Sequence, residues 1–172
     1  MLIVTGGIAC GKSTFVEVAR ELGYKIIDAD EWYHDVYMLS TSFDNAKQLL
    51  FGSVSIGAVA FRHSNWKAFE RIVAAAFCTY VTNNQPRIVV IPEYFKHKRL
   101  IDRHLGPVTV LTIERKDNYS AAYERDSEKR SADLTARIIN AQTPSTARVV
   151  QADHVMYNGG SRDEFKQECQ AW

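Results

Sequence analysis

The apolar positions of this chain form short continuous runs that are separated by longer amphipathic stretches. Continuous runs at 2–4, 88–91 and 108–113 predict strands that are buried on both faces. Apolar residues at helical spacing predict helices over 12–22 and 66–83. Two further strands are expected at 24–27 and 154–157. Two short helices are expected within 31–50, with a break around 40–42, and two helical stretches within 117–142. Asn65 is expected to cap the long helix, and a capping box at 161–164 to open a C-terminal helix. Strands that alternate with helices predict an α/β fold with a mainly parallel sheet.

Composition narrows the class of protein further. The chain has 172 residues, 46% of them apolar and 24% charged, with a formal net charge of +1. Near-neutral charge argues against a nucleic-acid or membrane partner, and no apolar run reaches the ~18 residues of a membrane span. The three cysteines are far apart in the sequence and predict neither a disulfide framework nor a zinc site. With no signal-peptide pattern at the start of the chain, we expect a cytoplasmic protein.

The strongest motif lies between the first predicted strand and the first predicted helix. Residues 6–13, GGIACGKS, match the phosphate-loop pattern G-x-x-x-x-G-K-[ST] without a mismatch. Backbone N–H groups of such a loop surround phosphate oxygens, while the lysine reaches the β- and γ-phosphates and the serine hydroxyl ligates Mg²⁺. The sequence therefore predicts ATP and Mg²⁺ as cofactors. The expected nucleotide-binding residues are Gly6, Gly7, Ile8, Ala9, Cys10, Gly11, Lys12, Ser13 and Thr14.

Cys10 has two interpretations. A thiolate near a helix N-terminus is stabilised, so the side chain could be reactive. Alternatively, Cys10 is a small residue that fills a variable position of the loop.

Carboxylates follow two of the predicted strands. Asp28 and Asp30 end the second strand, where ligand crevices form in sheets of this type. We expect Asp28 to join Ser13 at Mg²⁺ and Asp30 to accept a proton from an attacking hydroxyl. Asp30 could instead cap a helix that begins at Glu31. Glu93, after the third strand, could join the metal shell or lie on the surface.

A charged segment late in the chain predicts a cationic lid. Arg125, Lys129, Arg130 and Arg137 surround a helix-breaking stretch, and guanidinium groups can stabilise charge on a transferring phosphoryl group. The alternative is a solvated charged surface. With the loop lysine and the carboxylate, the expected catalytic residues are Lys12, Asp30, Arg125 and Arg137.

Three segments together resemble the dephospho-CoA kinase family. They are residues 5–14 with 26–30, the Arg-Ile-x-x-Gln-type stretch at 137–142, and the Ala-Asp-x-Val to Asn-Gly stretch at 152–159. The resemblance implies a three-layer α/β/α P-loop NTPase fold with a mainly parallel five-stranded sheet, a helical acceptor lobe and a small lid. It also implies that Asn158 and Gly159 lie near the adenine, that Asp30 is the base and that Arg125 and Arg137 contact phosphate. In this scheme the single domain has its core at 1–29, 85–116 and 147–172, its acceptor lobe at 30–84 and its lid at 117–146.

The middle of the chain departs from the family. The family's His-Pro pair in the long helix is replaced by residues 72–76, IVAAA, and its Pro-Leu-Leu by residues 92–95, PEYF. The Asp-Gly-x-Leu-x-Arg segment is missing, and Ala121 stands where the lid carries an arginine. Three rings (Trp32, Tyr33 and Trp66) and four basic residues (Arg62, His63, Lys67 and Arg71) could hold a smaller nucleotide, unless the rings are core.

Three functions stay open at this point. The first is an ATP-dependent kinase for the ribose 3′-hydroxyl of dephospho-CoA, and the second is a (deoxy)nucleoside monophosphate kinase on the same scaffold. The third is an ATP-binding module without catalysis. For the first two we expect a small, nucleotide-like acceptor and a protein that is monomeric or a weak homo-oligomer.

Overall fold

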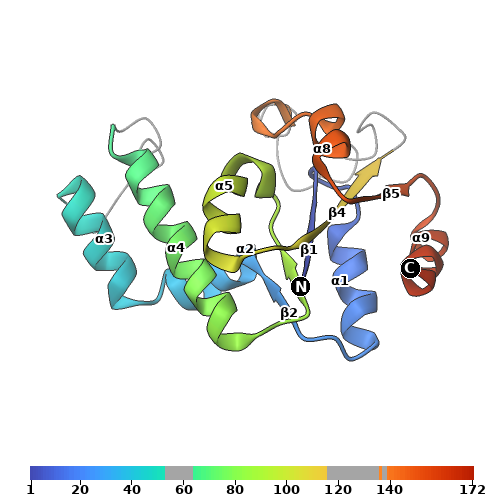
Figure 1. The fold of residues 1–172 in the computed structure, drawn as a ribbon, viewed down its shortest axis with the longest axis horizontal. Coiled ribbons are helices and arrows are strands. Elements are labelled where there is room, and N and C mark those ends of the chain that lie inside the picture. The colour runs from blue at the N-terminus through green and yellow to red at the C-terminus, as the bar shows by residue number, and fades with distance from the viewer. Residues whose placement is uncertain (53–63, 116–135, 137–138) are drawn as a thin grey trace. The chain divides into compact units, whose positions relative to one another are not determined.

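A single parallel sheet organises the chain (Figure 1). The computed structural model describes residues 1–52, 64–115, 136 and 139–172. The sheet has five strands in the order β2-β3-β1-β4-β5, and the predicted P-loop α/β class is confirmed. The strands are β1 (Leu2–Gly6), β2 (Ile26–Asp28), β3 (Ile88–Val90), β4 (Thr109–Arg115) and β5 (His154–Asn158).

β1 lies at the centre of the sheet and pairs in parallel with two strands. Leu2 is in register with Ile88 of β3 and with Thr109 of β4, and Leu111 of β4 is in register with His154 of β5. From β3 the chain crosses to the opposite side of β1. In sheets of this kind ligands bind beyond the carboxyl end of the strand at which the order reverses. The segment after Gly6 therefore begins at the place where a ligand crevice is expected.

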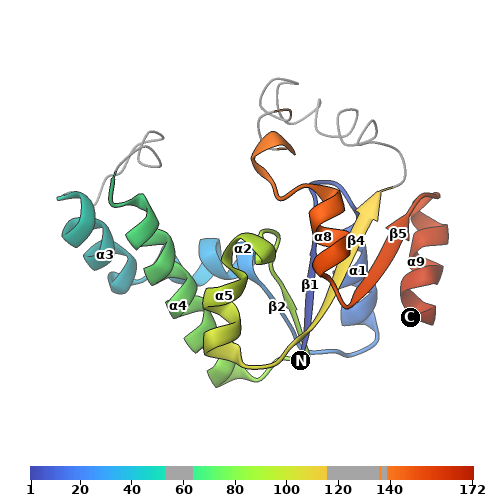
Figure 2. The same cartoon turned by 45° about the horizontal axis from the view of Figure 1, so that its top comes forward.

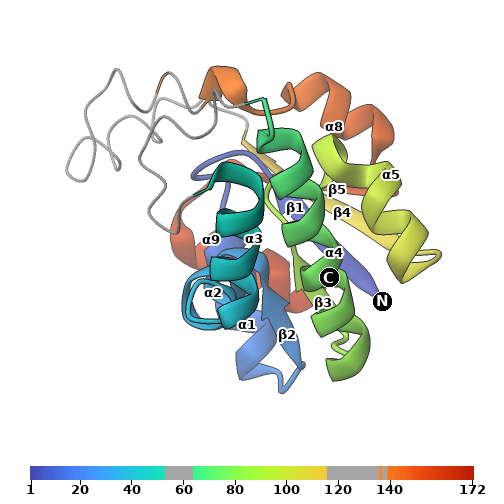
Figure 3. The same ribbon diagram turned by 90° about the vertical axis from the view of Figure 1, so that its left-hand side faces the viewer.

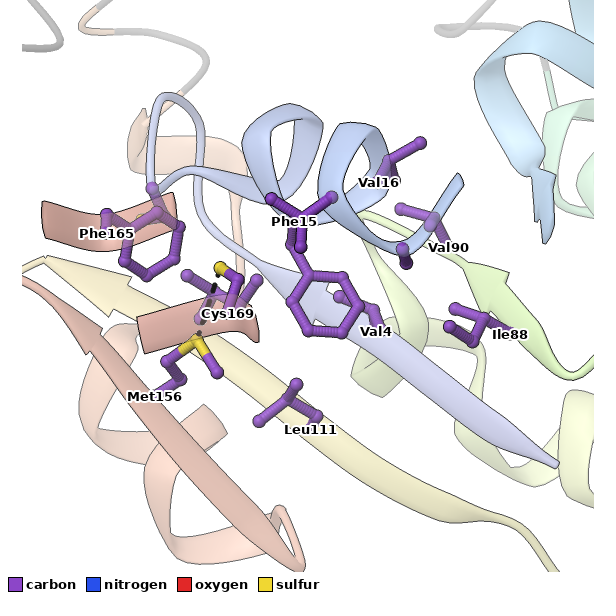
Figure 4. Packing of buried hydrophobic residues seen from close by; sticks show 13 residues of the cluster. Val4, Phe15, Val16, Ile88, Val90, Leu111, Met156, Phe165 and Cys169 are labelled. Atoms are coloured by element: carbon purple, nitrogen blue, oxygen red, sulfur yellow. Dashed lines mark hydrogen bonds between the residues drawn. The ribbon is translucent and has the colours of Figure 1, made fainter. Parts of the chain in front are cut away.

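The first of two compact units comprises residues 1–26, 86–96 and 108–172. Helices α1 (Lys12–Glu21) and α9 (Arg162–Ala171) pack against each other on one face of its strands, and α8 (Ser145–Gln151) covers the other face (Figures 2 and 3). Between α1, α9 and the strands lies an apolar core built around Val4, Phe15, Leu111 and Phe165 (Figure 4). This core fixes β1 and α1, the two elements that flank the phosphate-loop motif.

The second unit comprises residues 27–85 and 97–107 and is mainly helical. Its elements are α2 (Ala29–Trp32), the π-helix η1 (Tyr33–Tyr37), α3 (Thr41–Phe51), α4 (Trp66–Asn84) and most of α5 (Tyr94–Leu105). Aromatic rings form its interior: Trp32 stacks on Tyr37 with centroids 4.9 Å apart and meets the edge of Phe77 at 5.0 Å. Trp32, one of the rings considered for a nucleotide, is thus buried core.

Most predicted elements occur at the predicted places. The break around residues 40–42 is real, because the Ser40 hydroxyl accepts from the Phe43 N–H and starts α3. The capping box of Ser161 and Glu164 opens α9 as expected. Asn65 precedes α4 but does not cap it, since its side-chain amide donates to the Leu50 carbonyl instead.

Two helices were not predicted, and one prediction lies outside the described residues. α5 follows Pro92 and carries many cations that obscure its apolar face, and α8 has only seven residues. The helical stretches expected within 117–142 fall largely in the ranges 116–135 and 137–138, outside the part that the structure describes. Among the described helices, none is long and apolar enough to cross a membrane.

Candidate phosphate-binding site

The loop between β1 and α1 depends on two glycines. Gly6 has φ +143°, and a Cβ there would overlap the carbonyl of Ile113 on β4. Gly11 has φ +108°, and a Cβ there would lie 2.6 Å from the Asn158 amide and 2.7 Å from the Phe165 ring. Both positions therefore require glycine for its conformational range and for its lack of a side chain.

Lys12 reaches back over the loop that it follows. Its Nζ donates to the Gly6 carbonyl at 2.9 Å and to the Gly7 carbonyl at 2.7 Å. The ammonium group is thereby held over the start of the loop, where a bound polyphosphate would meet a fixed positive charge. Ser13 is exposed in the first turn of α1, while Thr14 is buried.

Cys10 is part of the core. Its side chain is fully buried, and burial, more than the nearby Glu114 carboxylate, raises the pKa of the thiol. A stabilised thiolate is contradicted, and the interpretation as a small filling residue holds. The reason is that the thiol lies in the apolar cluster rather than in front of the helix N-terminus.

Three side chains from outside the loop each hold one of its backbone groups. The Ile8 N–H donates to Oε1 of Gln142 at 3.0 Å, and Nη1 of Arg115 donates to the Ala9 carbonyl at 3.3 Å. Nδ2 of Asn158 donates to the Cys10 carbonyl at 3.1 Å. Ala9 itself has φ +55°, a conformation that such fixed contacts can maintain.

A buried ion pair supports this set of contacts. Glu114 of β4 and Arg148 of α8 are bonded through two nitrogen–oxygen contacts of 2.6 Å each, with side chains 1% and 3% exposed. Glu114 also accepts from the hydroxyls of Thr112 and Ser145. Burial alone would raise the pKa of Glu114, but the bonds from Arg148 and the two hydroxyls outweigh it and lower that pKa.

Glu93 follows β3 and is half-buried, so it is not the surface residue that the sequence allowed. Burial raises its pKa, partly offset by a bond from the Thr143 N–H. Its Oε2 is buried and has no hydrogen-bond partner among the described residues. A role at a metal stays a prediction, because no group of three or more potential metal ligands exists within the described part of the chain.

In the second unit, Asp28 rather than Asp30 is the helix cap. Oδ1 of Asp28 accepts from the N–H groups of Asp30 and Glu31 at 2.8 and 3.4 Å and starts α2 at Ala29. The alternative of Asp30 as a cap is therefore wrong, because the helix begins at Ala29, two residues before Glu31. Burial raises the pKa of Asp28, whereas Asp30 is exposed.

Several predicted residues are not described. Arg125, Lys129, Arg130, Arg137, Arg62 and His63 lie outside the described ranges. Lys67 and Arg71 are exposed on α4, and Gly159 is exposed just after β5. The roles proposed for all these residues stay predictions.

Sequence reasoning missed the residues that hold the loop from outside. Gln142 lies in a segment singled out for its family resemblance, but no role was drawn from it. The sequence did not indicate a role for Arg115, Glu114 or Arg148, because the bonding partner of each lies more than 30 positions away in the chain.

A central parallel strand, a glycine-dependent loop and a lysine folded over that loop define a P-loop phosphate-binding protein. The sequence profile of the dephospho-CoA kinase family matches residues 1–54. Dephospho-CoA kinase from Campylobacter jejuni (strain RM1221) is 28% identical over 187 residues, which cover 96% of this chain and 91% of that protein. The enzyme of the same name from Streptococcus thermophilus is 61% identical over 33 residues, 19% of this chain and 17% of that protein.

A solved structure shares the fold of this chain. The solved structure of dephospho-CoA kinase from Campylobacter jejuni has a TM-score of 0.59 and 22% identity, covering 98% of this chain and 92% of that one. In sequence, this chain is thus similar to dephospho-CoA kinases over most of its length.

Proposed function

We propose that the protein is an ATP-dependent kinase that phosphorylates the ribose 3′-hydroxyl of dephospho-CoA. The observation that carries the proposal is the similarity to a dephospho-CoA kinase over 96% of this chain and 91% of the relative. The phosphate loop supports it, since Gly6, Gly11 and Lys12 retain the geometry that such chemistry needs.

Each residue has a distinct role in the proposed reaction. Backbone N–H groups of the loop and the Lys12 ammonium bind the phosphates of ATP and stabilise charge on the γ-phosphoryl group. Asp30, exposed in the first turn of α2, takes the proton of the attacking hydroxyl. Arg125 and Arg137 add positive charge to the transferred group. We assign Asn158 and Gly159 to the adenine side of the nucleotide, by the family resemblance.

Mg²⁺ would be held by the hydroxyl of Ser13 and the carboxylate of Asp28. Their oxygens are the hard ligands that this ion prefers, and both helix-cap bonds of Asp28 go to its Oδ1. When bound with ATP, the ion supplies charge neutralisation at the phosphates.

The first experiment measures ADP release from Mg-ATP with one acceptor at a time. We expect turnover with dephospho-CoA and none above background with AMP, GMP, CMP, UMP or the deoxynucleotides. Turnover with a monophosphate alone would replace the proposed acceptor. ATP binding without turnover on any acceptor would indicate a module without catalysis.

A substitution then tests the proposed base. Asp30→Asn should lower kcat by about 10²- to 10⁴-fold, because it removes the proton acceptor, and should leave the Kd for ATP unchanged. Asp163→Asn, at an exposed position in the first turn of α9, is the matched control. Equal rates for the two variants would exclude Asp30 as the base.

A further inference from the structure

One peptide group connects Gln142 to Lys12. In a planar trans peptide, the carbonyl of one residue and the N–H of the next point in opposite directions. Both polar groups of the peptide between Gly7 and Ile8 are hydrogen-bonded. The Ile8 N–H donates to Oε1 of Gln142 at 3.0 Å, and the Gly7 carbonyl accepts from Nζ of Lys12 at 2.7 Å. Gln142 thus helps to orient this peptide, and the orientation determines one of the two carbonyl contacts of the ammonium group.

The same geometry applies to the next two peptides of the loop. Arg115 holds the Ala9 carbonyl, and Asn158 holds the Cys10 carbonyl. The N–H groups of Cys10 and Gly11 therefore point away from those side chains. Among these three external contacts, only that of Gln142 accepts a hydrogen bond from a loop N–H, and the carbonyl of the same peptide points at the lysine.

The segment that carries Gln142 is itself fixed by hydrogen bonds. Its neighbour Thr143 donates its N–H to the Glu93 carboxylate, and the Thr143 carbonyl accepts from Nη1 of Arg148. Arg148 is in turn fixed by the buried carboxylate of Glu114. The side chain that holds the loop is therefore carried by a segment that is bonded on both sides to buried or half-buried groups.

We propose that Gln142 is a positioning residue for Lys12 and acts through the Gly7–Ile8 peptide. This inference rests on the proposed function, in which Lys12 contacts the transferring phosphoryl group. Without an acceptor for the Ile8 N–H, the peptide keeps the bonds that its carbonyl accepts from Nζ of Lys12 at 2.7 Å and from the Cys10 N–H at 3.4 Å. Because Gly7 has no side chain to restrict it, we expect this peptide to rotate more readily. When the Gly7 carbonyl turns away from Nζ, the ammonium group loses one of its two carbonyl contacts in the loop.

The test compares three variants of the full chain. Gln142→Ala removes the acceptor, Gln142→Glu keeps an acceptor oxygen, and Gln151→Ala makes the same truncation at an exposed position of α8, where Nε2 donates to the Ala147 carbonyl. We expect Gln142→Ala to lower kcat with ATP and dephospho-CoA by about 10- to 100-fold, with the KM for dephospho-CoA unchanged. Gln151→Ala should match the wild type. A kcat of Gln142→Ala within twofold of Gln151→Ala overturns the proposal.

A second readout needs no catalysis. Hydrogen exchange of the Ile8 amide in the ligand-free protein, followed by NMR, should become at least tenfold faster in Gln142→Ala and stay slow in Gln142→Glu and Gln151→Ala. If the wild type turns over no acceptor, the proposed function fails while this exchange measurement still tests the contact. Unchanged Ile8 exchange in Gln142→Ala, or fast exchange in Gln142→Glu, overturns the role of Gln142 independently of activity.

Discussion

The two units of this chain hold their structure by different means. In the first unit, side chains bond to groups far away in sequence: Gln142 to Ile8, Arg115 to Ala9 and Asn158 to Cys10. Among the described residues of the second unit, side-chain hydrogen bonds are mostly local, as in the helix bonds of Thr79 and Thr82, and aromatic rings pack in the interior.

This difference matches what each kind of contact requires. A backbone bond over a long distance needs one residue type at one position, whereas a cluster of rings tolerates exchange if its volume is kept. The replaced family segment at 72–76 lies in the second unit, and the phosphate loop lies in the first. We therefore expect the loop of the first unit to tolerate fewer substitutions than the ring cluster of the second unit.

The largest effect is expected at the buried ion pair of the first unit. Arg148→Ala leaves the Glu114 carboxylate buried and unpaired, so the free energy of unfolding should fall by about 3–5 kcal/mol in urea titrations. The control is Arg162→Ala, which breaks an ion pair with Glu17 at the surface, where the arginine side chain is 66% exposed. That variant should lose less than about 1 kcal/mol. Equal losses would show that burial of the Glu114–Arg148 pair does not make it more important for stability than a surface pair.

A smaller effect of opposite sign is expected in the ring cluster. The Tyr37 hydroxyl is buried without a hydrogen-bond partner among the described residues, and burial raises its pKa. Tyr37→Phe removes an unpaired polar group but keeps the stacking on Trp32, so it should stabilise the protein by about 1 kcal/mol in urea. Tyr157→Phe, at an exposed site on β5, should change nothing. Destabilisation by Tyr37→Phe would mean that the second unit also depends on a specific polar contact.

The smallest effect is expected at Glu93 and depends on pH. Because burial raises its folded-state pKa, the ionised carboxylate costs stability at pH 8, and this cost disappears as the pH falls through the folded-state pKa toward the unfolded value of about 4.3. Glu93→Gln should therefore exceed the wild type by about 0.5–1 kcal/mol at pH 8 and equal it near pH 4. Chemical denaturation at the two pH values measures this, with Glu21→Gln at the exposed end of α1 as control. A constant difference between pH 4 and pH 8 would refute the titration.

Local patterns were sufficient to predict much of this structure. The phosphate loop could be predicted because its determinants, Gly6 to Ser13, are contiguous in sequence. The start of α9 could be predicted because Ser161 and Glu164 form a self-contained cap. Gln142 and Arg148 could not be assigned a role, because their partners are fixed only by the fold. Asp28 and Asp30 were recognised as a pair, but which of them caps α2 depends on a single backbone turn.

The central position of β1 also has a consequence for biosynthesis. Leu2 leaves the ribosome well before its partners Ile88 and Thr109, which lie much later in the chain. The nascent strand is therefore an apolar edge without a partner during most of translation, and pairings over such distances form slowly. We expect the nascent chain to depend on shielding of this segment until β4 has emerged. The phosphate loop, which is translated directly after β1, becomes a binding site only when Gln142 and Asn158 near the other end of the chain have been added.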